Sequence, residues 1–254
     1  LIAAQNMGAN LYSTICGDGN DWFQATTPDP DRAANPEAKI YLDTVSARML
    51  RSFGPGLSTF YAAAVPWCAD IAALGTSCII SDEGTTRRRL IDTCVSPASF
   101  VFAVDVDGMA DELHVERWLT AVQAARFYGA DDLPAKIRDA ALQGKQDVRY
   151  RFVQAIQPND SYTPGSFGPK GRPFISTHVC EEGRAVVRQL GMYEQNFAIP
   201  RWDVDGENPW GRGLGYLTLA SGRKLRAQAH DNLQAGALMA RPPIATAGTR
   251  ALRE

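Results

Sequence analysis

Two short stretches of this chain have residue types that bind metal ions, but neither has the spacing of a complete site. His178 and Cys180 lie two residues apart, which on a β-strand places both side chains on one face, and imidazole and thiolate are zinc ligands. Nothing in the sequence suggests a third or fourth ligand. Asp105-Val-Asp-Gly108 begins like a calcium loop, but Ala103 would occupy its first ligand position and His114 its twelfth. We therefore predict a strand with a satisfied imidazole, a hairpin turn, and no metal or other cofactor.

Motifs for phosphate or ester chemistry are incomplete. Gly211-Arg-Gly-Leu-Gly215 is not a dinucleotide-binding G-x-G-x-x-G, because Tyr216 replaces the last glycine and no clear strand leads directly into it. Gly144-Lys145 is not a phosphate loop, since Gln146 follows the lysine, and the chain has no G-x-S-x-G elbow. Arg87-Arg88-Arg89 could contact phosphate, but short charge runs usually face water, so a solvated loop is the preferred interpretation. We predict no catalytic residues, and that the protein is not an enzyme.

Composition indicates a globular protein without a strong charge excess. The chain has 254 residues, enough for one large or two small domains, with 45% hydrophobic and 21% charged residues. Its net charge of −2 lacks the basic excess of proteins that grip nucleic acid strongly. This balance is compatible with nucleic acid passing over the protein, and it argues against tight binding.

Cysteine usage and hydropathy bear on the compartment. The five cysteines are widely spaced and form no C-x-x-C pair, which favours a reduced, intracellular setting over a disulfide framework. No apolar run approaches the roughly 20 residues of a membrane span. No basic region precedes an apolar N-terminal segment, so no signal peptide is expected.

The N-terminal part is predicted to be mainly helical. Residues 1–15 are weakly helical, and residues 16–35 are rich in Gly, Asp, Thr and Pro and are expected to form a long loop. Residues 37–53 carry apolar residues near helical spacing. Gly54-Pro55-Gly56 should end that helix, and a helical pattern resumes over residues 57–65.

The middle of the chain is predicted to be rich in strands. Short β-branched and aromatic runs alternate with turn signals there, and Asp107-Gly108 is a hairpin signal. Thr120 and Pro134 are suited to begin helices that Gly129 and Gly144 end. The predicted strands cover 77–80, 100–104, 112–118, 148–156, 174–180 and 185–190, and the helices 121–128 and 134–142.

The most distinctive segment is a glycine-rich turn before a long helix. Asn208-Pro209 is not expected to continue a regular element, because proline fixes φ and restrains the residue before it. Alternating glycines imply strained or closely packed backbone, and Arg212 is the charge among them. We expect Arg212 to bridge to a carboxylate or carbonyl and so fix the angle of the helix. The predicted hinge motif is Pro209, Trp210, Gly211, Arg212, Gly213 and Gly215.

The helix that follows has one apolar stripe and is weak by itself. At ~1.5 Å per residue, its roughly 25 residues form a rod of about 37 Å. Gly222 and Gly236 inside it each cost about 1 kcal/mol relative to alanine, so neighbouring chains would have to support it. The stripe consists of Leu217, Leu225, Ala229, Leu233 and Ala237, and the other faces carry Arg223, Lys224, Arg226, Gln228 and Asp231.

Pro209-Trp-Gly-Arg-Gly213 resembles the proline-aromatic-Gly-Arg-Gly signature of the head-to-tail connector, or portal, proteins of short-tailed bacteriophages. Other segments resemble that family in the same order, over nearly the whole chain. They are the early helix Asp43–Ser58, Val65-Pro-Trp67, the Gly-Thr strand Leu74–Ile80, the helix pair Leu119–Pro134, the strand Val153–Pro158, and Pro200-Arg-Trp202 before the Gly-Arg-Gly turn.

The chain departs from the family pattern in two places. Only the seven residues Cys68 to Leu74 separate Trp67 from Gly75, where the family has a longer helical insertion. The chain also stops soon after Pro242-Pro243, where the family continues.

The resemblance implies a structural role without catalysis or cofactor. Portal proteins form homo-oligomeric rings, usually of twelve subunits, at one capsid vertex, and double-stranded DNA enters and leaves through the channel. The expected partners are the capsid protein, the terminase large subunit and the tail adaptor. No contact with a membrane is expected. The expected location is the virion, with the host cytoplasm during assembly. The helix would line the channel or a subunit interface through Leu217, Arg223, Lys224, Leu225, Arg226 and Leu233.

The predicted fold class is α+β, of the portal-subunit type. Residues 1–67 would form the helical N-terminal part of a wing, and residues 68–206 its α/β body. Residues 207–241 would form the turn and a stem-like helix, and residues 242–254 the start of a clip-like region.

Two other function classes remain as alternatives. One is another ring-forming head-tail adaptor, although adaptors are usually smaller and helical, unlike the strand-rich segment 76–190. The other is a metal-dependent nuclease or hydrolase, which no ligand constellation supports.

Overall fold

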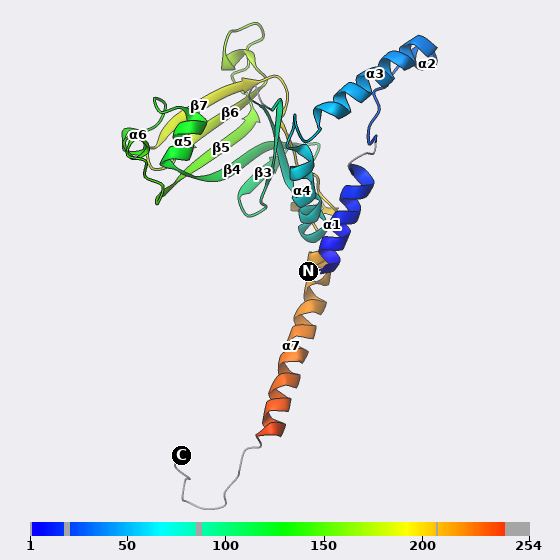
Figure 1. Ribbon diagram of the computed structural model, residues 1–254, viewed down its shortest axis with the longest axis vertical. Coiled ribbons are helices and arrows are strands. Elements are labelled where there is room, and N and C mark those ends of the chain that lie inside the picture. The colour runs from blue at the N-terminus through cyan, green and yellow to red at the C-terminus, as the bar shows by residue number, and fades with distance from the viewer. Residues whose placement is uncertain (1, 18–20, 85–87, 207, 242–254) are drawn as a thin grey trace, which may run out of the picture.

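The computed structural model describes residues 2–17, 21–84, 88–206 and 208–241. The predicted clip-like region, 242–254, and Arg87 of the arginine run lie outside the described residues. Figure 1 shows a body built around a twisted sheet, from which one long helix projects downward and a shorter helical arm projects upward.

The chain is of the mixed α+β class, as predicted. The helices are α1 (Ile2–Ile15), α2 (Pro30–Ala33), α3 (Pro36–Ser52), α4 (Phe60–Leu74), α5 (Ala121–Tyr128), α6 (Ala135–Leu142) and α7 (Leu214–Ala240), with a 3-10 turn at Pro169–Gly171. The strands are β1 (Cys78–Glu83), β2 (Leu90–Val95), β3 (Phe100–Val104), β4 (Ala110–Thr120), β5 (Arg149–Pro158), β6 (Phe174–Cys180), β7 (Ala185–Met192), β8 (Phe197–Ala198), β9 (Val204–Asp205) and β10 (Asn208–Gly211).

The main sheet is an antiparallel meander in the order β3-β4-β5-β6-β7. Alternate residues of β5 point into the core, because successive side chains of a strand face opposite sides. α5 and α6 cover this face, and Ile137 and Phe152 are fully buried between the layers. The predicted cap at Thr120 is confirmed as a complete capping box with Gln123.

A second core joins this sheet to the small sheet β2-β1-β8. Ile80 of β1 and Phe197 of β8 pack with Leu113 of β4 and Ile156 of β5. The predicted strand at 77–80 is therefore confirmed and extends to Glu83. The strand β2 was not predicted, because its polar residues interrupt the β-branched run and it follows the arginines.

The helical N-terminal part is joined to the body through α4. α1 packs along α4 so closely that a Cβ on Gly8 would lie 2.7 Å from the Cα of Ala69. α3 leaves this pair as an arm, and it is tied at its middle by the hydrogen bond from Ala25 N to Ser46 Oγ, 2.8 Å. At its base, Trp22 stacks on Phe60 with ring centroids 5.3 Å apart.

The helix α4 is longer than the sequence suggested. It begins at Phe60, passes through Pro66 and ends only at Leu74. The short connection that the sequence left between Trp67 and Gly75 is thus the second half of α4, and the proposed boundary between residues 67 and 68 falls inside this helix. Gly75 ends α4 in the left-handed conformation, with φ of 89°.

Candidate functional site: the glycine junction and the projecting helix

The glycine-rich segment is a strand–turn–helix unit rather than a free turn. β10 pairs with β9, with a register shift between Asn208 and Gly211, and α7 begins at Leu214. Two expectations are therefore wrong. Asn208-Pro209 does belong to a regular element, and a strand does lead into the glycines. Pro209 is tolerated because the pair is a short, irregular edge, where a missing N–H need not break the ladder.

The glycines press against the end of α4, backbone against backbone. A Cβ on Gly213 would lie 2.4 Å from the amide nitrogen of Gly75, and a Cβ on Gly211 would lie 2.3 Å from the Gly75 oxygen. A Cβ on Gly215 would lie 2.4 Å from the Ala73 oxygen. Real Cβ atoms do not approach backbone this closely, so the junction requires glycine on both sides. We call Gly75, Gly211, Gly213 and Gly215 the glycine junction.

Hydrogen bonds hold the junction in place. Gly211 N donates to Thr76 Oγ1 at 2.8 Å, and Gly213 N donates to the Leu74 oxygen at 3.2 Å. Trp202 N donates to the Gly75 oxygen at 2.7 Å. The first residues of α7 are thus fixed to the last residues of α4, although more than 130 positions separate them in the sequence.

Trp210 anchors the same segment in the second core. Its ring stacks on Phe100 at a centroid distance of 5.5 Å and meets the edge of Phe102 at 4.8 Å. Arg201 Nη1 donates to the Pro209 oxygen at 3.3 Å. Aromatic pairs with this geometry add about 0.5–1.5 kcal/mol beyond burial, so the segment is attached to the sheet as well as to α4.

Arg212 bridges to two carboxylates, as expected. Its Nη1 lies 3.2 Å from Asp205 Oδ2, and its Nε lies 3.5 Å from Asp203 Oδ2. The contact of Nε with Asp203 is an ion pair without hydrogen-bond geometry. The backbone N–H of Arg212 also donates to the Trp202 oxygen at 2.9 Å. The guanidinium therefore links the start of α7 to the β9 segment.

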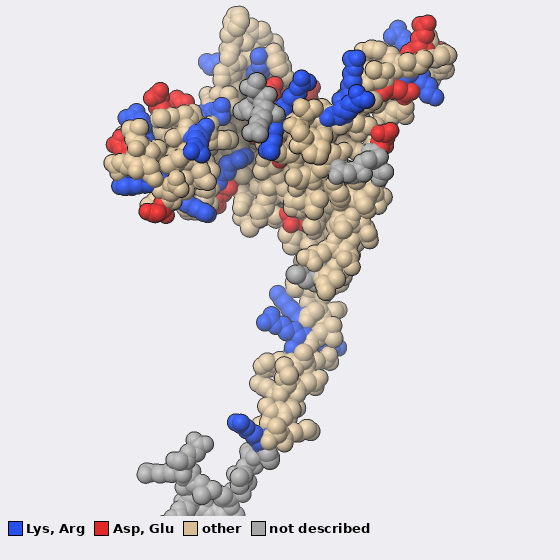
Figure 2. Space-filling view, in the orientation of Figure 1, with Lys and Arg blue, Asp and Glu red and all other residues tan. Residues whose placement is uncertain are grey.

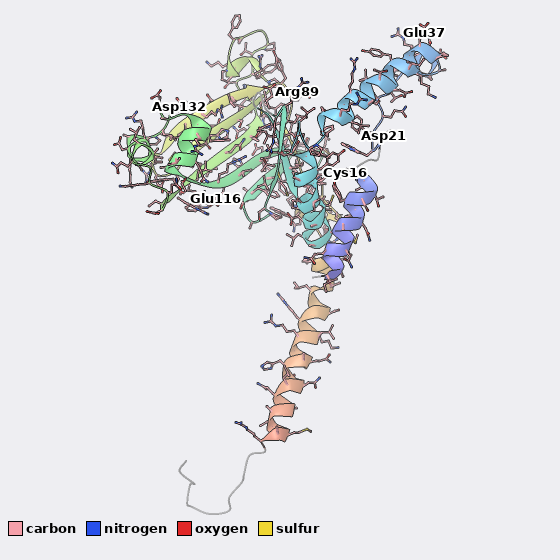
Figure 3. The ribbon with its side chains drawn as sticks, viewed as in Figure 1. Cys16, Asp21, Glu37, Arg89, Glu116 and Asp132 are labelled. Carbon is pink, nitrogen blue, oxygen red and sulfur yellow. The ribbon has the colours of Figure 1, made fainter. Side chains whose placement is uncertain are left out.

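The helix α7 stands free of the body after its first turn. It has 27 residues, about 40 Å at ~1.5 Å per residue, and none of them is buried against the residues that the structure describes. Leu217, Leu225 and Leu233 are 57%, 66% and 75% exposed. Figure 3 shows the α7 side chains pointing away from the rod on both sides over its whole lower length. The predicted apolar stripe therefore has no partner within the described chain.

The charges of α7 are mostly positive. Arg223, Lys224 and Arg226 are exposed and form no ion pair with any described residue. Asp231 is the acidic residue of the helix, and it lies 3.7 Å from His230. Figure 2 shows the basic groups gathered on the upper part of the rod.

The residues first considered for metal binding serve the core of the sheet. His178 and Cys180 do share a face of β6, and both are buried. His178 Nδ1 lies 3.2 Å from Tyr128 Oη, and its Nε2 lies 3.3 Å from Ser176 Oγ. Burial, with the charges of Arg117 and Arg188 nearby, lowers the pKa of His178 to about 4. No three His, Cys, Asp or Glu side chains gather as a metal site in the described part of the chain.

Sequence reasoning found one side of the junction and missed the other. Gly75, Thr76 and Trp202 meet the predicted motif, but nothing in their local sequence marks them as its partners. The one local signal for this partner is Gly75, which follows the apolar run of α4. A glycine at that place is also typical of an ordinary helix end, so it does not indicate the contact. Among the described helices, none has the length and hydropathy needed to cross a membrane.

Comparison with known proteins gives a consistent picture. A family model described as bacteriophage head to tail connecting protein matches residues 1–249. The chain is 24% identical over 247 residues to the portal protein of Salmonella phage epsilon15, covering 96% of this chain and 44% of that protein. It is 22% identical over 247 residues to the probable portal protein of Bordetella phage BPP-1, covering 95% of this chain and 43% of that one. The chain thus spans less than half the length of these curated relatives.

Proposed function

Because this chain belongs to the family of bacteriophage head-to-tail connecting proteins, we propose that it is the wing and stem part of a portal subunit. Copies of it form a closed ring at one capsid vertex, and double-stranded DNA passes through the ring during packaging and ejection. The role is structural and involves no catalysis. The protein is a virion component that assembles in the host cytoplasm.

The observation that carries this proposal is the unsupported helix α7. A helix with glycines at 222 and 236 and no packed face gains little from its own sequence, because most helical stability in proteins comes from tertiary packing. Head-to-tail contacts between copies, closed by a cyclic symmetry, would bury its exposed leucines. The free helix is therefore explained by assembly.

One face of α7 is suited to close helix packing. Gly222, Ala229 and Gly236 recur every seven residues, which is close to two helical turns, so these positions follow one line along the part of the rod that is free of the body. Leu225 and Leu233 flank this line. Small residues let a neighbouring helix approach, and the leucines supply apolar area. We assign this face to the contact with the next subunit.

The glycine junction sets the direction of the stem in this proposal. Pro209, Trp210 and Arg212 fix its outer side, and the glycines fix its contact with α4. Since α4 also packs on α1, the stem angle is coupled to the N-terminal helices. Arg223, Lys224 and Arg226 belong to faces that line the channel or neighbouring subunits.

The remaining assignments follow the family. Since α4 is one helix, the helical part of the wing extends to Leu74 rather than to residue 67, the α/β body follows up to residue 206, and residues 207–241 form the turn and stem. Residues 242–254 begin a clip-like region that meets the terminase large subunit and, later, the tail adaptor. The wing contacts the capsid protein, and the ring is expected to have about the twelve copies usual in this family.

The test is the assembly state of the purified chain. We expect negative-stain images to show rings with a central channel, and native mass spectrometry to give a multiple of the subunit mass. Leu225→Asp and Leu233→Asp should abolish rings while leaving the near-ultraviolet circular dichroism of the body unchanged, because neither residue contacts it. Gln228→Asp, which places the same carboxylate on a polar position of α7, is the control and should still form rings.

A chain that stays monomeric at micromolar concentrations, with α7 intact by circular dichroism, would contradict the proposal. So would rings that tolerate both leucine substitutions.

A further inference from the structure

Six arginines form a row across the top of the body. Arg48 and Arg51 lie on α3, Arg88 and Arg89 lie between β1 and β2, and Arg117 and Arg188 lie on β4 and β7. Figure 2 shows basic side chains following one another from the base of the α3 arm toward the helix-covered face of the main sheet. We call these six residues the arginine row.

Backbone contacts bring the first part of the row together. Arg89 N donates to the Leu57 oxygen at 2.8 Å, which holds the β1–β2 loop against the turn that follows α3. The same turn is closed by the hydrogen bond from Gly54 N to the Arg51 oxygen, 3.1 Å. Figure 3 places Arg89 beside the base of the arm. The C-terminal end of α3 and the loop that carries Arg88 and Arg89 are therefore neighbours.

The hairpin also reaches the second part of the row. Asp82 lies on β1, close to the loop. Burial raises the pKa of its carboxyl group, and the positive charges of Arg117 and Arg188 partly oppose this effect. Both arginines are therefore close to Asp82. The guanidinium carbons of Arg117 and Arg188 lie 5.8 Å and 5.9 Å from the ring centre of Phe127. These two cations thus lie close to the same aromatic ring, next to the hairpin. Arg117 is half-buried and donates to Gln154, so it adds positive charge behind the row, and the exposed arginines are the ones that can contact phosphate.

The charge of the row is largely uncompensated. None of the six arginines forms an ion pair with a described residue. The nearest carboxylates have other partners, since Asp82 accepts from Asn196, and Asp92 accepts from Ser58 and Ser81. The exposed carboxylates in this region are Glu83, beside the loop, and Asp21 and Asp43, which lie with Ala47 and Leu50 near the arginines of α3, so they offset part of the charge. A near-neutral protein has therefore concentrated positive charge along one line.

We propose that the arginine row binds the phosphate backbone of double-stranded nucleic acid, at a surface separate from α7. Arginine forks match phosphate oxygens in pairs, and a line of cations fits a polyanion of uniform charge better than it fits a single carboxylate. The contacts are to phosphates, so binding is independent of base sequence and steeply dependent on salt. The row lies on the body, so this inference does not depend on ring formation.

The experiment measures binding of a fluorescent duplex of about 25 base pairs by anisotropy, over a series of salt concentrations. The test variant carries Arg88→Gln, Arg89→Gln and Arg188→Gln, which are exposed and outside the core. The control variant carries Lys136→Gln, Lys145→Gln and Arg149→Gln, which remove the same charge from exposed positions elsewhere on the body. The oligomeric state of each sample is measured in parallel, so a failure of assembly is scored separately.

We expect the wild type to bind two unrelated duplex sequences equally. The slope of log K against log salt should fall by about one for each arginine removed in the test variant, and it should stay unchanged in the control. Equal loss in the two variants would overturn the proposal. So would loss of binding only on substitution of Arg223 and Arg226 in α7. Poly-glutamate and unlabelled DNA are compared as competitors of the labelled duplex at equal charge. If the two compete equally well, the proposal is overturned in favour of an acidic protein partner.

Discussion

At the scale of single residues, the sheet core contains a continuous polar chain. Arg117 donates to Gln154 at 3.0 Å, and Gln154 donates to Ser176 at 3.1 Å. Ser176 and Tyr128 then contact the two ring nitrogens of His178, which is only 3% exposed. A buried imidazole that is neutral and partnered at both nitrogens satisfies its polar atoms, but a proton on it would add a third positive charge beside Arg117 and Arg188.

We predict that this chain of polar groups makes the protein acid-sensitive. The pKa of His178 is lowered to about 4 in the folded state, from 6.5. Between these values the unfolded chain binds a proton that the folded protein does not. The neutral His178 side chain therefore contributes roughly 3 kcal/mol to the free energy of unfolding above about pH 6.5. This contribution is lost as pH falls through about 4.

Denaturant unfolding of the wild type and of His178→Gln at several pH values checks this. The variant should lose less stability between pH 6.5 and 4, because its amide does not titrate. If the free energy of unfolding falls with pH equally in the wild type and the variant, groups other than His178 cause the acid sensitivity.

Arg212 is the second informative residue, because its exposure limits what its ion pairs contribute. Its side chain is 37% exposed, and those of Asp203 and Asp205 are 52% and 50% exposed. Half-exposed pairs are screened by water and typically contribute about 0.2–1 kcal/mol each. We therefore expect Arg212→Ala to lower the free energy of unfolding of the body by about 1 kcal/mol.

Thermal unfolding in low and high salt measures this effect. Arg223→Ala on the free part of α7 is the control and should leave the stability of the body unchanged. Equal stability of Arg212→Ala and wild type in low salt would show that the bridge does not hold the junction.

At the scale of elements, the junction between α4 and α7 is a contact of backbones. Helices usually meet through side chains at axial distances of about 8–10 Å. Here the end of one helix and the start of the next approach until no Cβ fits between them, and hydrogen bonds cross the contact. Such a joint has few ways to move, so α7 should follow α4 as a rigid extension.

We predict that the same substitution has opposite effects at two positions around α7. Gly213→Ala forces a Cβ to within 2.4 Å of the Gly75 nitrogen and should destabilise the body by about 3 kcal/mol. Gly222→Ala meets no atom within 4 Å and should stabilise the helix of the isolated subunit by up to about 1 kcal/mol.

Urea unfolding monitored by tryptophan fluorescence reports the body. Circular dichroism at the helical band reports all the helices, so the difference between Gly222→Ala and wild type reports α7. The rigid junction would be contradicted if Gly213→Ala unfolded at the same urea concentration as Gly222→Ala.

At the scale of the whole molecule, the described chain is a compact body with two projections that bury little of their surface. The α3 arm buries only Ser46 of its helix, and α7 buries nothing among the described residues. A monomer of this shape exposes apolar side chains that a stable solitary protein would cover. This shape supports the proposal that the chain is part of an assembly.

We predict that bulk on the small-residue face of α7 separates helix stability from assembly. Gly222→Leu and Gly236→Leu should raise the helicity of the free subunit, because leucine has the better helix propensity and both positions are open. They should prevent ring formation, because the added side chains keep a neighbouring helix away. Mass photometry beside circular dichroism tests both results, and rings formed by the double variant would assign the subunit contact to another face.

The local features of this protein can be predicted from its sequence. The cap at Thr120, the turn at Asp107-Gly108, the alternation along β5 and the glycine-rich start of α7 depend on residues close together in the chain, so their patterns are readable. The order of family-like segments along the chain is also a property of the sequence, and it is sufficient to indicate the family.

The places where these elements meet depend on the tertiary structure. The short strands β8, β9 and β10 have no pattern of their own and exist because partners already in place accept their hydrogen bonds. The match of Gly75 with Gly211 and Gly213, and the passage of α4 through Pro66, likewise depend on contacts between distant segments. Such contacts leave no periodic signal, because the residues that make them are selected by a fit in space rather than by their neighbours in the chain.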